Sequence, residues 1–304
     1  MASWRNARRG SPCTICGKPS WCSRSDDGAW VLCRRIDTQG IHRVDSAGVD
    51  YWLYRLADSP TAPPVVADEP GAERAAAEDL DRVYRVVLAH LSLSSAHRAA
   101  LADRGLDAVA IQTAMYRTLP PRGRAELARA VLERFPERLV LSVPGFHRQE
   151  SGRGAYGTFG GAQGLLIPVL DVEGRVVALK VRVDKADDGP RYLYVSSTAH
   201  GGPGPGAPVH IPARASGDGT VDDDGSLHVV RVTEGELKAN VATALSGILT
   251  VSVPGVSAWR GALPVLRTLR PTRVLLAFDA DATTNAHVAR ATEATAEALS
   301  REGW

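Results

Sequence analysis

The chain has 304 residues, enough for two or three domains, and its apolar fraction of 44% is ordinary for a soluble globular protein. Its formal net charge of +2 excludes a uniformly basic nucleic-acid clamp. No run approaches the roughly 20 apolar residues of a membrane span and the N-terminus has no apolar secretory core, so a cytoplasmic protein without membrane partners is expected.

The first segment, 1–56, contains every cysteine of the chain and is predicted to be a small metal-binding module. The cysteines are Cys13, Cys16, Cys22 and Cys33. The Cys13-x2-Cys16 spacing turns two sulfurs toward one ion, and clustered cysteines in a reducing cytosol are typical of metal sites rather than disulfides. Four thiolates fill a tetrahedral shell, so we expect a structural zinc ion. An alternative ligand set for this zinc, in which His42 takes the place of one cysteine, stays open.

The same module is rich in positive charge. Residues 1–44 carry eight Lys or Arg and three Asp, which indicates an anionic partner such as nucleic acid. Trp21 and Trp30 lie among arginines, and aromatic rings beside guanidinium groups suit stacking on single-stranded bases and pairing with phosphates. The two tryptophans equally suit the small core of the module, and this second interpretation is favoured.

A stretch rich in Pro, Ala and acid, 57–79, is predicted to be a linker before a middle block, 80–226. The block opens with four segments at helical spacing, DLDRVYRVVLAHL, SSAHRAALADRGL, DAVAIQTAMYRTL and GRAELARAVLERF. DAVAIQTA is short and poor in basic residues, so packing is favoured over a helix-turn-helix. The glycine-rich SGRGAYGTFGGAQG is interpreted as a flexible connection, and the strands GLLIPVLD and RVVALKVRVD follow.

Residues 227–304 alternate apolar strands with helices, which predicts a parallel α/β sheet. The strand RVLLAF leads directly into Asp279 and Asp281, which share a face if the extended chain continues. The strand LHVVRVT ends just before Glu234, at the carboxyl edge where such sheets bind ligands. Three carboxylates at one edge repel one another unless a cation neutralises them, so Mg²⁺ or Mn²⁺ is expected there. A helix cap is the alternative role for Asp281.

The sequence VTEGELKANVATAL followed by VLLAFDADA resembles the TOPRIM fold of bacterial DnaG-type primases, phage primase-helicases and topoisomerases. The resemblance implies that Glu234, Asp279 and Asp281 are catalytic and hold magnesium, and Glu236 matches a second acid of some phage primases. The segment 164–197 is similar to the basic subdomain that precedes TOPRIM in these primases. Template or nucleotide is then expected to bind the following residues: Lys180, Arg182, Lys185, Arg191 and Lys238.

A zinc module, a basic subdomain and TOPRIM follow one another in primases, and the cysteine arrangement looks most like that of primase-like proteins from plasmids, phages and integrative elements. The expected class is α/β, α+β overall, with a zinc-ribbon-like module, a mixed α/β basic subdomain and a Rossmann-like parallel sheet. Lys238 stands where many primases carry a further acid, and the cysteine spacing differs from the usual primase zinc ribbon. The TOPRIM part is expected to be incomplete, because the chain stops at Trp304.

The resemblance implies a DNA primase that joins ribonucleotides on single-stranded DNA by magnesium-dependent nucleotidyl transfer, in replication of a chromosome, plasmid or phage. Its partners would be the template, nucleoside triphosphates and a replicative helicase encoded separately, since the sequence has no G-x-x-x-x-G-K-[ST] loop. A non-catalytic zinc/TOPRIM protein that binds replication DNA or docks on a helicase is the second hypothesis. A TOPRIM nuclease or topoisomerase is the third, which the basic subdomain fits less well.

Overall fold

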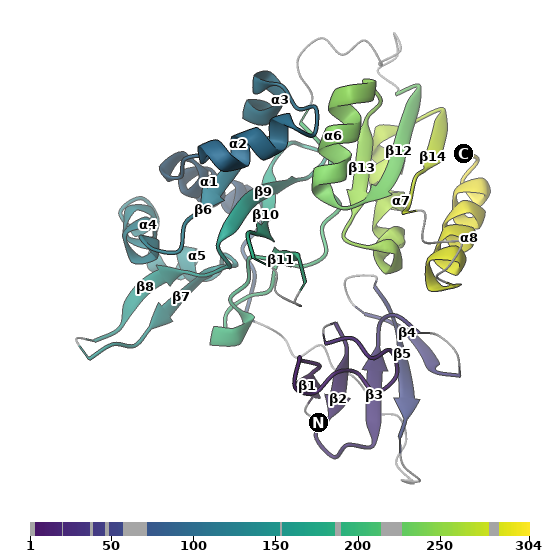
Figure 1. Cartoon of the computed structure of the whole chain (residues 1–304), viewed down its shortest axis with the longest axis horizontal. Helices are drawn as coiled ribbons and strands as arrows, with labels where there is room; N and C mark the ends of the chain where they lie inside the picture. Colours follow the sequence, from purple (N-terminus) through teal and green to yellow (C-terminus); the bar gives the residue numbers. More distant parts are fainter. Residues whose placement is uncertain are drawn as a thin grey trace.

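The structure is a computed structural model that describes residues 4–19, 21–36, 39–45, 49–56, 72–152, 154–185, 190–213, 227–279 and 286–304. A cysteine-bearing β module, a middle block with a four-stranded antiparallel sheet and a C-terminal block with a three-stranded parallel sheet follow one another along the chain (Figure 1). This is the mixed α/β class that the sequence predicts. No helix in the described ranges is long and apolar enough to cross a membrane.

The cysteine module is an antiparallel sheet in the order β1-β2-β3-β5-β4. Its strands are β1 (Trp4–Asn6), β2 (Ser23–Ser25), β3 (Trp30–Cys33), β4 (Ile41–Val44) and β5 (Asp50–Arg55). The β2–β3 hairpin turns at Gly28, whose φ of 72° favours glycine. Trp30 is 4% exposed and belongs to the core, whereas the core interpretation is wrong for Trp21, which is 51% exposed.

The middle block packs helices against its sheet. The helices are α1 (Ala77–His90), α2 (Ser95–Ala102), α3 (Ala108–Thr113), α4 (Arg124–Leu132) and α5 (Glu137–Leu141). The sheet has the order β11-β10-β9-β6, from β6 (Arg117–Leu119), β9 (Gly164–Leu170), β10 (Val176–Val183) and β11 (Tyr192–Tyr194). Helix α1 lies on β10 because its apolar face, Leu80, Val83, Tyr84 and Val87, is fully buried in the same core as Leu179 and Val181.

Two sequence predictions in this block are wrong. DAVAIQTAMYRTL is not one helix: α3 ends at Thr113, Met115 takes a left-handed φ of 54°, and Arg117–Leu119 pairs with β9. The glycine-rich stretch is not only a connection, because Tyr156–Phe159 forms β8 against β7 (Phe146–Gln149). The contact between the buried rings of Phe146 and Phe159, with centroids 4.8 Å apart, holds that hairpin together.

The C-terminal block is the predicted parallel α/β unit. Strands β12 (Val229–Glu234), β13 (Thr250–Val253) and β14 (Arg273–Leu276) run in the order β13-β12-β14, all parallel. They alternate with α6 (Glu236–Ser246), a 3-10 segment η2 (Val256–Gly261), α7 (Ala262–Leu269) and α8 (Ala286–Arg301). A shorter 3-10 turn, η1 (Thr198–His200), follows β11 in the middle block. The central strand β12 ends at Glu234, so its carboxylate lies at the carboxyl edge of the sheet.

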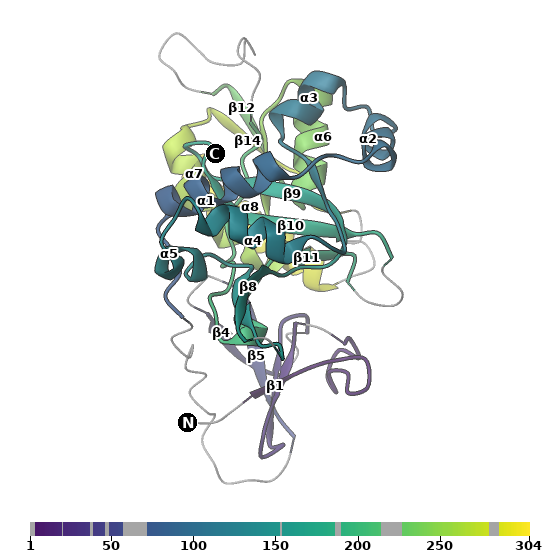
Figure 2. The same ribbon diagram turned by 90° about the vertical axis from the view of Figure 1, so that its left-hand side faces the viewer.

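Helix α6 joins the middle and C-terminal blocks, and it lies beside β9 in both views (Figures 1 and 2). A buried polar chain crosses this boundary. Asn240 of α6 accepts a hydrogen bond from His210 Nε2 at 3.0 Å and donates one to the Tyr116 hydroxyl at 2.7 Å, while His210 Nδ1 accepts from the Leu170 amide at 3.0 Å. Burial lowers the pKa of His210, consistent with a neutral ring in this chain. Directional hydrogen bonds, as well as apolar packing, therefore fix the position of the two blocks relative to each other.

Candidate functional site

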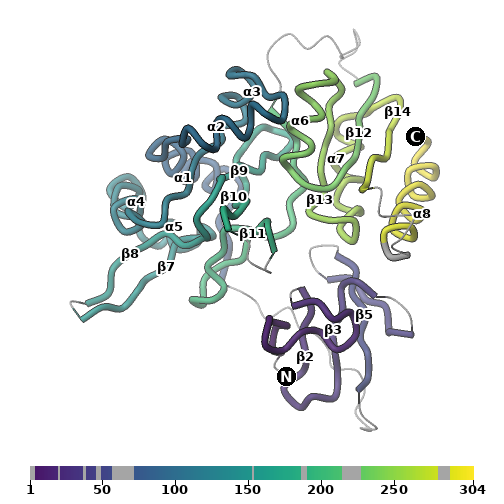
Figure 3. Tube along the Cα trace, in the orientation of Figure 1, coloured from purple at the N-terminus to yellow at the C-terminus, as the bar shows by residue number. Residues whose placement is uncertain are grey.

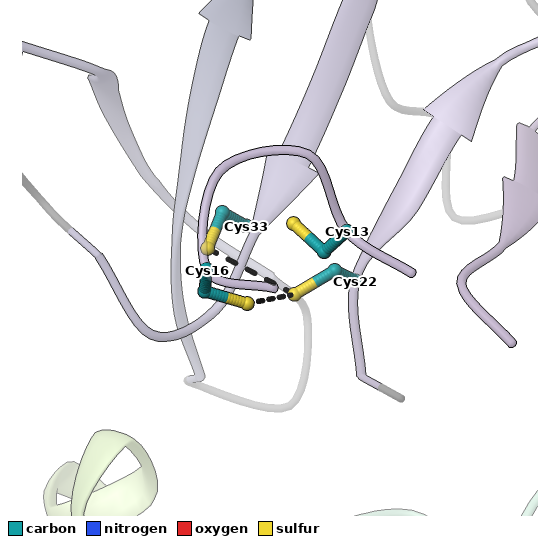
Figure 4. A group of neighbouring side chains, drawn as sticks. All are labelled: Cys13, Cys16, Cys22 and Cys33. Carbon is teal, nitrogen blue, oxygen red and sulfur yellow. Dashed lines mark hydrogen bonds between the residues drawn. The ribbon is translucent and has the colours of Figure 1, made fainter. Parts of the chain in front are cut away.

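The four cysteine sulfurs converge on one point, as Figure 4 shows. They lie within 4.8 Å of one another. Cys13 and Cys16 lie on a tight turn in which the Gly17 amide donates to the Cys13 carbonyl at 2.8 Å, while Cys22 precedes β2 and Cys33 ends β3. The described ranges contain this one group of side chains with the spacing of a metal centre, and it has the four sulfur donors of a closed tetrahedral shell.

The pKa values of two of the four thiols, Cys13 and Cys22, are raised in the absence of a cation. Burial raises the pKa of Cys13 to about 11, and a hydrogen bond from Cys22 to Cys33, followed by burial, raises the pKa of Cys22 further. A bound metal ion would reverse this preference because its ligands are thiolates. The alternative ligand His42 is not supported: its Nε2 atom lies 2.7 Å from Asp50 Oδ1 instead.

The acidic edge of the parallel sheet brings together two of the three predicted acids. The Asp279 amide donates to Glu234 Oε1 at 3.1 Å, although the two residues are 45 positions apart. Strand β14 ends at Leu276, but the Ala277 amide still donates to the Val232 carbonyl at 2.8 Å and so directs the chain to this edge. The Asp279 side chain is 50% exposed and therefore open to ligands. Asp281 lies outside the described residues.

Glu236 and Lys180 form a buried ion pair behind this edge. Lys180 Nζ donates to both carboxylate oxygens at 2.8 Å, and the Tyr194 hydroxyl donates to Oε1 at 3.1 Å. The Glu236 side chain is 1% exposed, and burial together with the Glu236 charge raises the pKa of Tyr194. Lys180 was expected to contact template or nucleotide, but in this structure its ammonium is held by Glu236. The pair instead fixes β10 of the basic sheet against the first turn of α6.

The other predicted cations lie in different surroundings. Arg182 is half-buried on β10, and its enclosed Nε atom has no hydrogen-bond partner. Lys185 and Arg191 are exposed at the same end of β10 and β11. Lys238 contacts Asp279 through a Nζ–Oδ1 ion pair at the acidic edge. The structure therefore gathers Lys238 with the acids and leaves Arg182, Lys185 and Arg191 on the neighbouring sheet.

A cleft of about 410 Å³ separates the cysteine module from the acidic edge. Glu234 and Asp279 line one side, and three cations with one aromatic ring line the other: Lys18, Arg34, Arg35 and Trp21. Trp21 lies over Gly255, since a Cβ at that position would be 3.6 Å from its ring. Sequence reasoning did not place Trp21 at the acids, because more than 200 positions separate it from them and nothing local signals the contact.

The module docks on η2 through polar contacts, below the C-terminal block in Figures 1 and 3. Arg260 Nη1 donates to Asp50 Oδ2 at 2.5 Å, and the other Asp50 oxygen faces His42. Ser257 Oγ donates to the Arg34 carbonyl at 3.5 Å. The Asp50 side chain is only 10% exposed, so the carboxylate of this ion pair is shielded from solvent.

Arg260→Gln is expected to loosen this docking. A partly exposed ion pair contributes about 0.5–1 kcal/mol, so amide hydrogen exchange within η2 should rise about two- to fivefold while global stability changes little. Arg267→Gln is the matched control, because Arg267 pairs with Glu302 and does not contact the module. Equal exchange rates in both variants would contradict a docking role for Arg260.

Comparison with known proteins gives the fold. No family model matches the sequence, and no curated protein matches it. The structure is similar to the zinc-binding and RNA polymerase domains of the Aquifex aeolicus primase, with a TM-score of 0.50 and 13% identity over 67% of this chain and 49% of that one. The fold is primase-like. The chain spans about half the length of that Aquifex aeolicus protein.

Two further solved structures are similar at lower scores. One is a DnaG primase catalytic domain bound to ssDNA, at a TM-score of 0.48 and 18% identity over 67% of this chain and 62% of that one. The other is the RNA polymerase domain of Mycobacterium tuberculosis primase DnaG with a double-stranded DNA oligomer bearing a 6-nucleotide overhang. Its TM-score is 0.49 and its identity 19%, over 70% of this chain and 67% of that one.

Proposed function

We propose that the chain is a DNA primase, which synthesises short RNA primers on single-stranded DNA by metal-dependent nucleotidyl transfer. One observation carries the proposal: in a primase-like fold, Glu234 and Asp279 converge at the carboxyl edge of a parallel sheet and face a cationic wall across a cleft. Carboxylates at such an edge suit a divalent metal, and opposed cations suit the phosphates that the metal would carry.

Glu234 and Asp279 are the residues that would hold Mg²⁺ or Mn²⁺, with Asp281 as a third ligand outside the described residues. Their fit rests on oxygen donors with an exposed face, which leaves room for the waters and phosphates that Mg²⁺ retains. When bound, the metal supplies activation of the primer 3′-hydroxyl and charge stabilisation of the leaving pyrophosphate. Glu234, which accepts a hydrogen bond from the Asp279 amide, would position the metal or act as the base that takes the hydroxyl proton.

The cysteine cluster is proposed to hold a structural zinc ion, because four thiolate donors leave no coordination position for substrate. The module then acts as a wall of the cleft. Lys18 is exposed there, and Trp21 presents a half-exposed ring on which a base can stack. Arg182, Lys185 and Arg191, on the neighbouring sheet, are proposed to bind template or triphosphate phosphates, together with Lys238 at the acids.

We propose that the protein acts in replication of a chromosome, plasmid or phage in the cytoplasm, together with a replicative helicase encoded separately. A second candidate is a non-catalytic replication protein that binds DNA or docks on a helicase. The ion pair between Lys238 and Asp279 favours it, because that lysine takes up part of the negative charge that a catalytic metal needs.

Primer synthesis tests the proposal directly. Zinc-loaded protein with single-stranded DNA, labelled nucleoside triphosphates and Mg²⁺ or Mn²⁺ should give short RNA products. Glu234→Gln and Asp279→Asn should each lower the rate by about 100-fold or more, because each removes a carboxylate that would hold the catalytic metal. The exposed Glu297→Gln on α8 is the control and should keep wild-type activity.

Either negative result has a definite meaning. Full activity in Asp279→Asn would reject the acidic edge as the catalytic centre. No product from the wild type under any metal, with single-strand binding intact, would reject the primase and favour the non-catalytic candidate. Circular dichroism and thermal melting of each variant show whether activity is lost because the charge is removed or because the protein no longer folds.

A further inference from the structure

Lys238 lies within the acidic edge itself. It is in the first turn of α6, and its Nζ atom contacts Asp279 Oδ1, the carboxylate whose backbone amide binds Glu234. The lysine and aspartate side chains are 49% and 50% exposed. A Cβ on Gly235 would lie 3.8 Å from Lys238 Cε, so the lysine side chain runs over Gly235 toward the strand ends. The ammonium is therefore placed among the proposed metal ligands.

The helix does not account for this placement. The first turn of an α-helix carries partial positive charge and disfavours a cation. The acid in that turn, Glu236, is already matched by Lys180, whose Nζ lies 2.8 Å from both of its oxygens. Lys238 is thus held at the helix start by Asp279 and the open edge, and not by α6.

The charges of the edge separate into two groups. Lys180 and Glu236 form a buried pair that is neutral as a unit. In front of it, the formal charges of Glu234, Asp279 and Lys238 sum to one negative charge. This sum leaves out Asp281, which lies outside the described residues. One divalent ion there leaves a small positive charge that attracts a triphosphate, whereas a second ion would meet an ammonium at the carboxylate it needs.

We propose that Lys238 is a built-in cation of this site, which takes the place of a second divalent ion and leaves room for one. The inference rests on the proposed metal at the acidic edge and deepens it. An ammonium on a flexible stem donates hydrogen bonds to phosphate oxygens as a point charge, but it does not activate water or a hydroxyl as a metal does. Lys238 then moves from Asp279 toward phosphate when a metal-bound triphosphate enters the cleft.

Binding of Mn²⁺ alone, counted by electron paramagnetic resonance on the zinc-loaded full chain, tests this without nucleotide or DNA. The wild type should bind one Mn²⁺ per chain, and Asp279→Asn should weaken that binding. Lys238→Met should bind one ion about tenfold more tightly, because a unit charge a few ångströms away is removed. Lys238→Asp should bind two. Arg98→Met, an exposed cation on α2, is the control for net charge and should match the wild type.

Three results would overturn the inference: two ions in the wild type, no ion at all, or an affinity of Lys238→Met equal to that of Arg98→Met. None of these decides whether the chain makes primers, which is measured separately. Conversely, if the chain makes no primer but shows this pattern of Mn²⁺ binding, the role of Lys238 as the built-in cation is supported. Only the primase activity is then rejected.

Discussion

Chelation of the proposed zinc is expected to unfold the cysteine module while the middle and C-terminal blocks stay folded. The module's strands are three to six residues long, and the cysteines are themselves a large part of one of its two small cores, together with Val31 and Tyr54. Domains this small rarely gain enough from burial alone. A structural zinc ion contributes about 10–16 kcal/mol of apparent binding free energy, which exceeds what such a core supplies.

The measurement is zinc content per chain, followed by nuclear magnetic resonance of the module and a thermal melt before and after a strong chelator. One zinc per chain and loss of the module's dispersed signals are expected, with the melt of the remaining blocks preserved. Cys33→Ser should reproduce the chelated state. Ser23→Ala on β2, whose hydroxyl bonds Asn6 at 2.8 Å, is the control and should cost no more than about 1 kcal/mol. A metal-free module with unchanged signals would refute a structural zinc.

The metal knuckle was predictable because it is local. The Cys13-x2-Cys16 turn is completed by Gly17 with φ 67°, and the partners Cys22 and Cys33 are brought in by one hairpin. The parallel sheet was predictable for a related reason. Strand β12 ends at Glu234 and Asp279 follows shortly after β14, so the two acids meet wherever β12 and β14 run in parallel. Short-range periodicity and one topological rule are sufficient for both features.

Long-range charge pairing was not predictable in the same way. The sequence shows Lys180 and Glu236 as one basic and one acidic residue at different motifs, and only the packing of α6 on β9 and β10 buries them together. The placement of Trp21 over Gly255 depends likewise on docking of two separate parts. Asp281 lies outside the described residues, so its predicted role as a metal ligand stays a prediction. Exposure and partner choice at these positions follow from tertiary structure, which residue patterns do not specify.

Lys180→Met is expected to destabilise the protein by about 3–5 kcal/mol, because it leaves the Glu236 carboxylate buried without its counter-charge. Both side chains are nearly inaccessible, at 8% and 1%, and the remaining partner, the Tyr194 hydroxyl at 3.1 Å, supplies one hydrogen bond and no charge. Glu236→Gln should also lower the free energy of unfolding, because it leaves the Lys180 ammonium buried without a counter-charge. Denaturant unfolding monitored by circular dichroism measures both changes.

The double variant Lys180→Met with Glu236→Leu separates charge burial from packing. Replacing a buried pair by apolar side chains of similar size is commonly neutral or stabilising, so the double variant should recover most of the loss. Lys185→Met is the same substitution at an exposed lysine just after β10. It should change the free energy of unfolding by no more than about 0.5 kcal/mol. If Lys180→Met matched Lys185→Met, the ion pair would not fasten β10 to α6, and Lys180 would again be available to bind template, as the resemblance to primases implies.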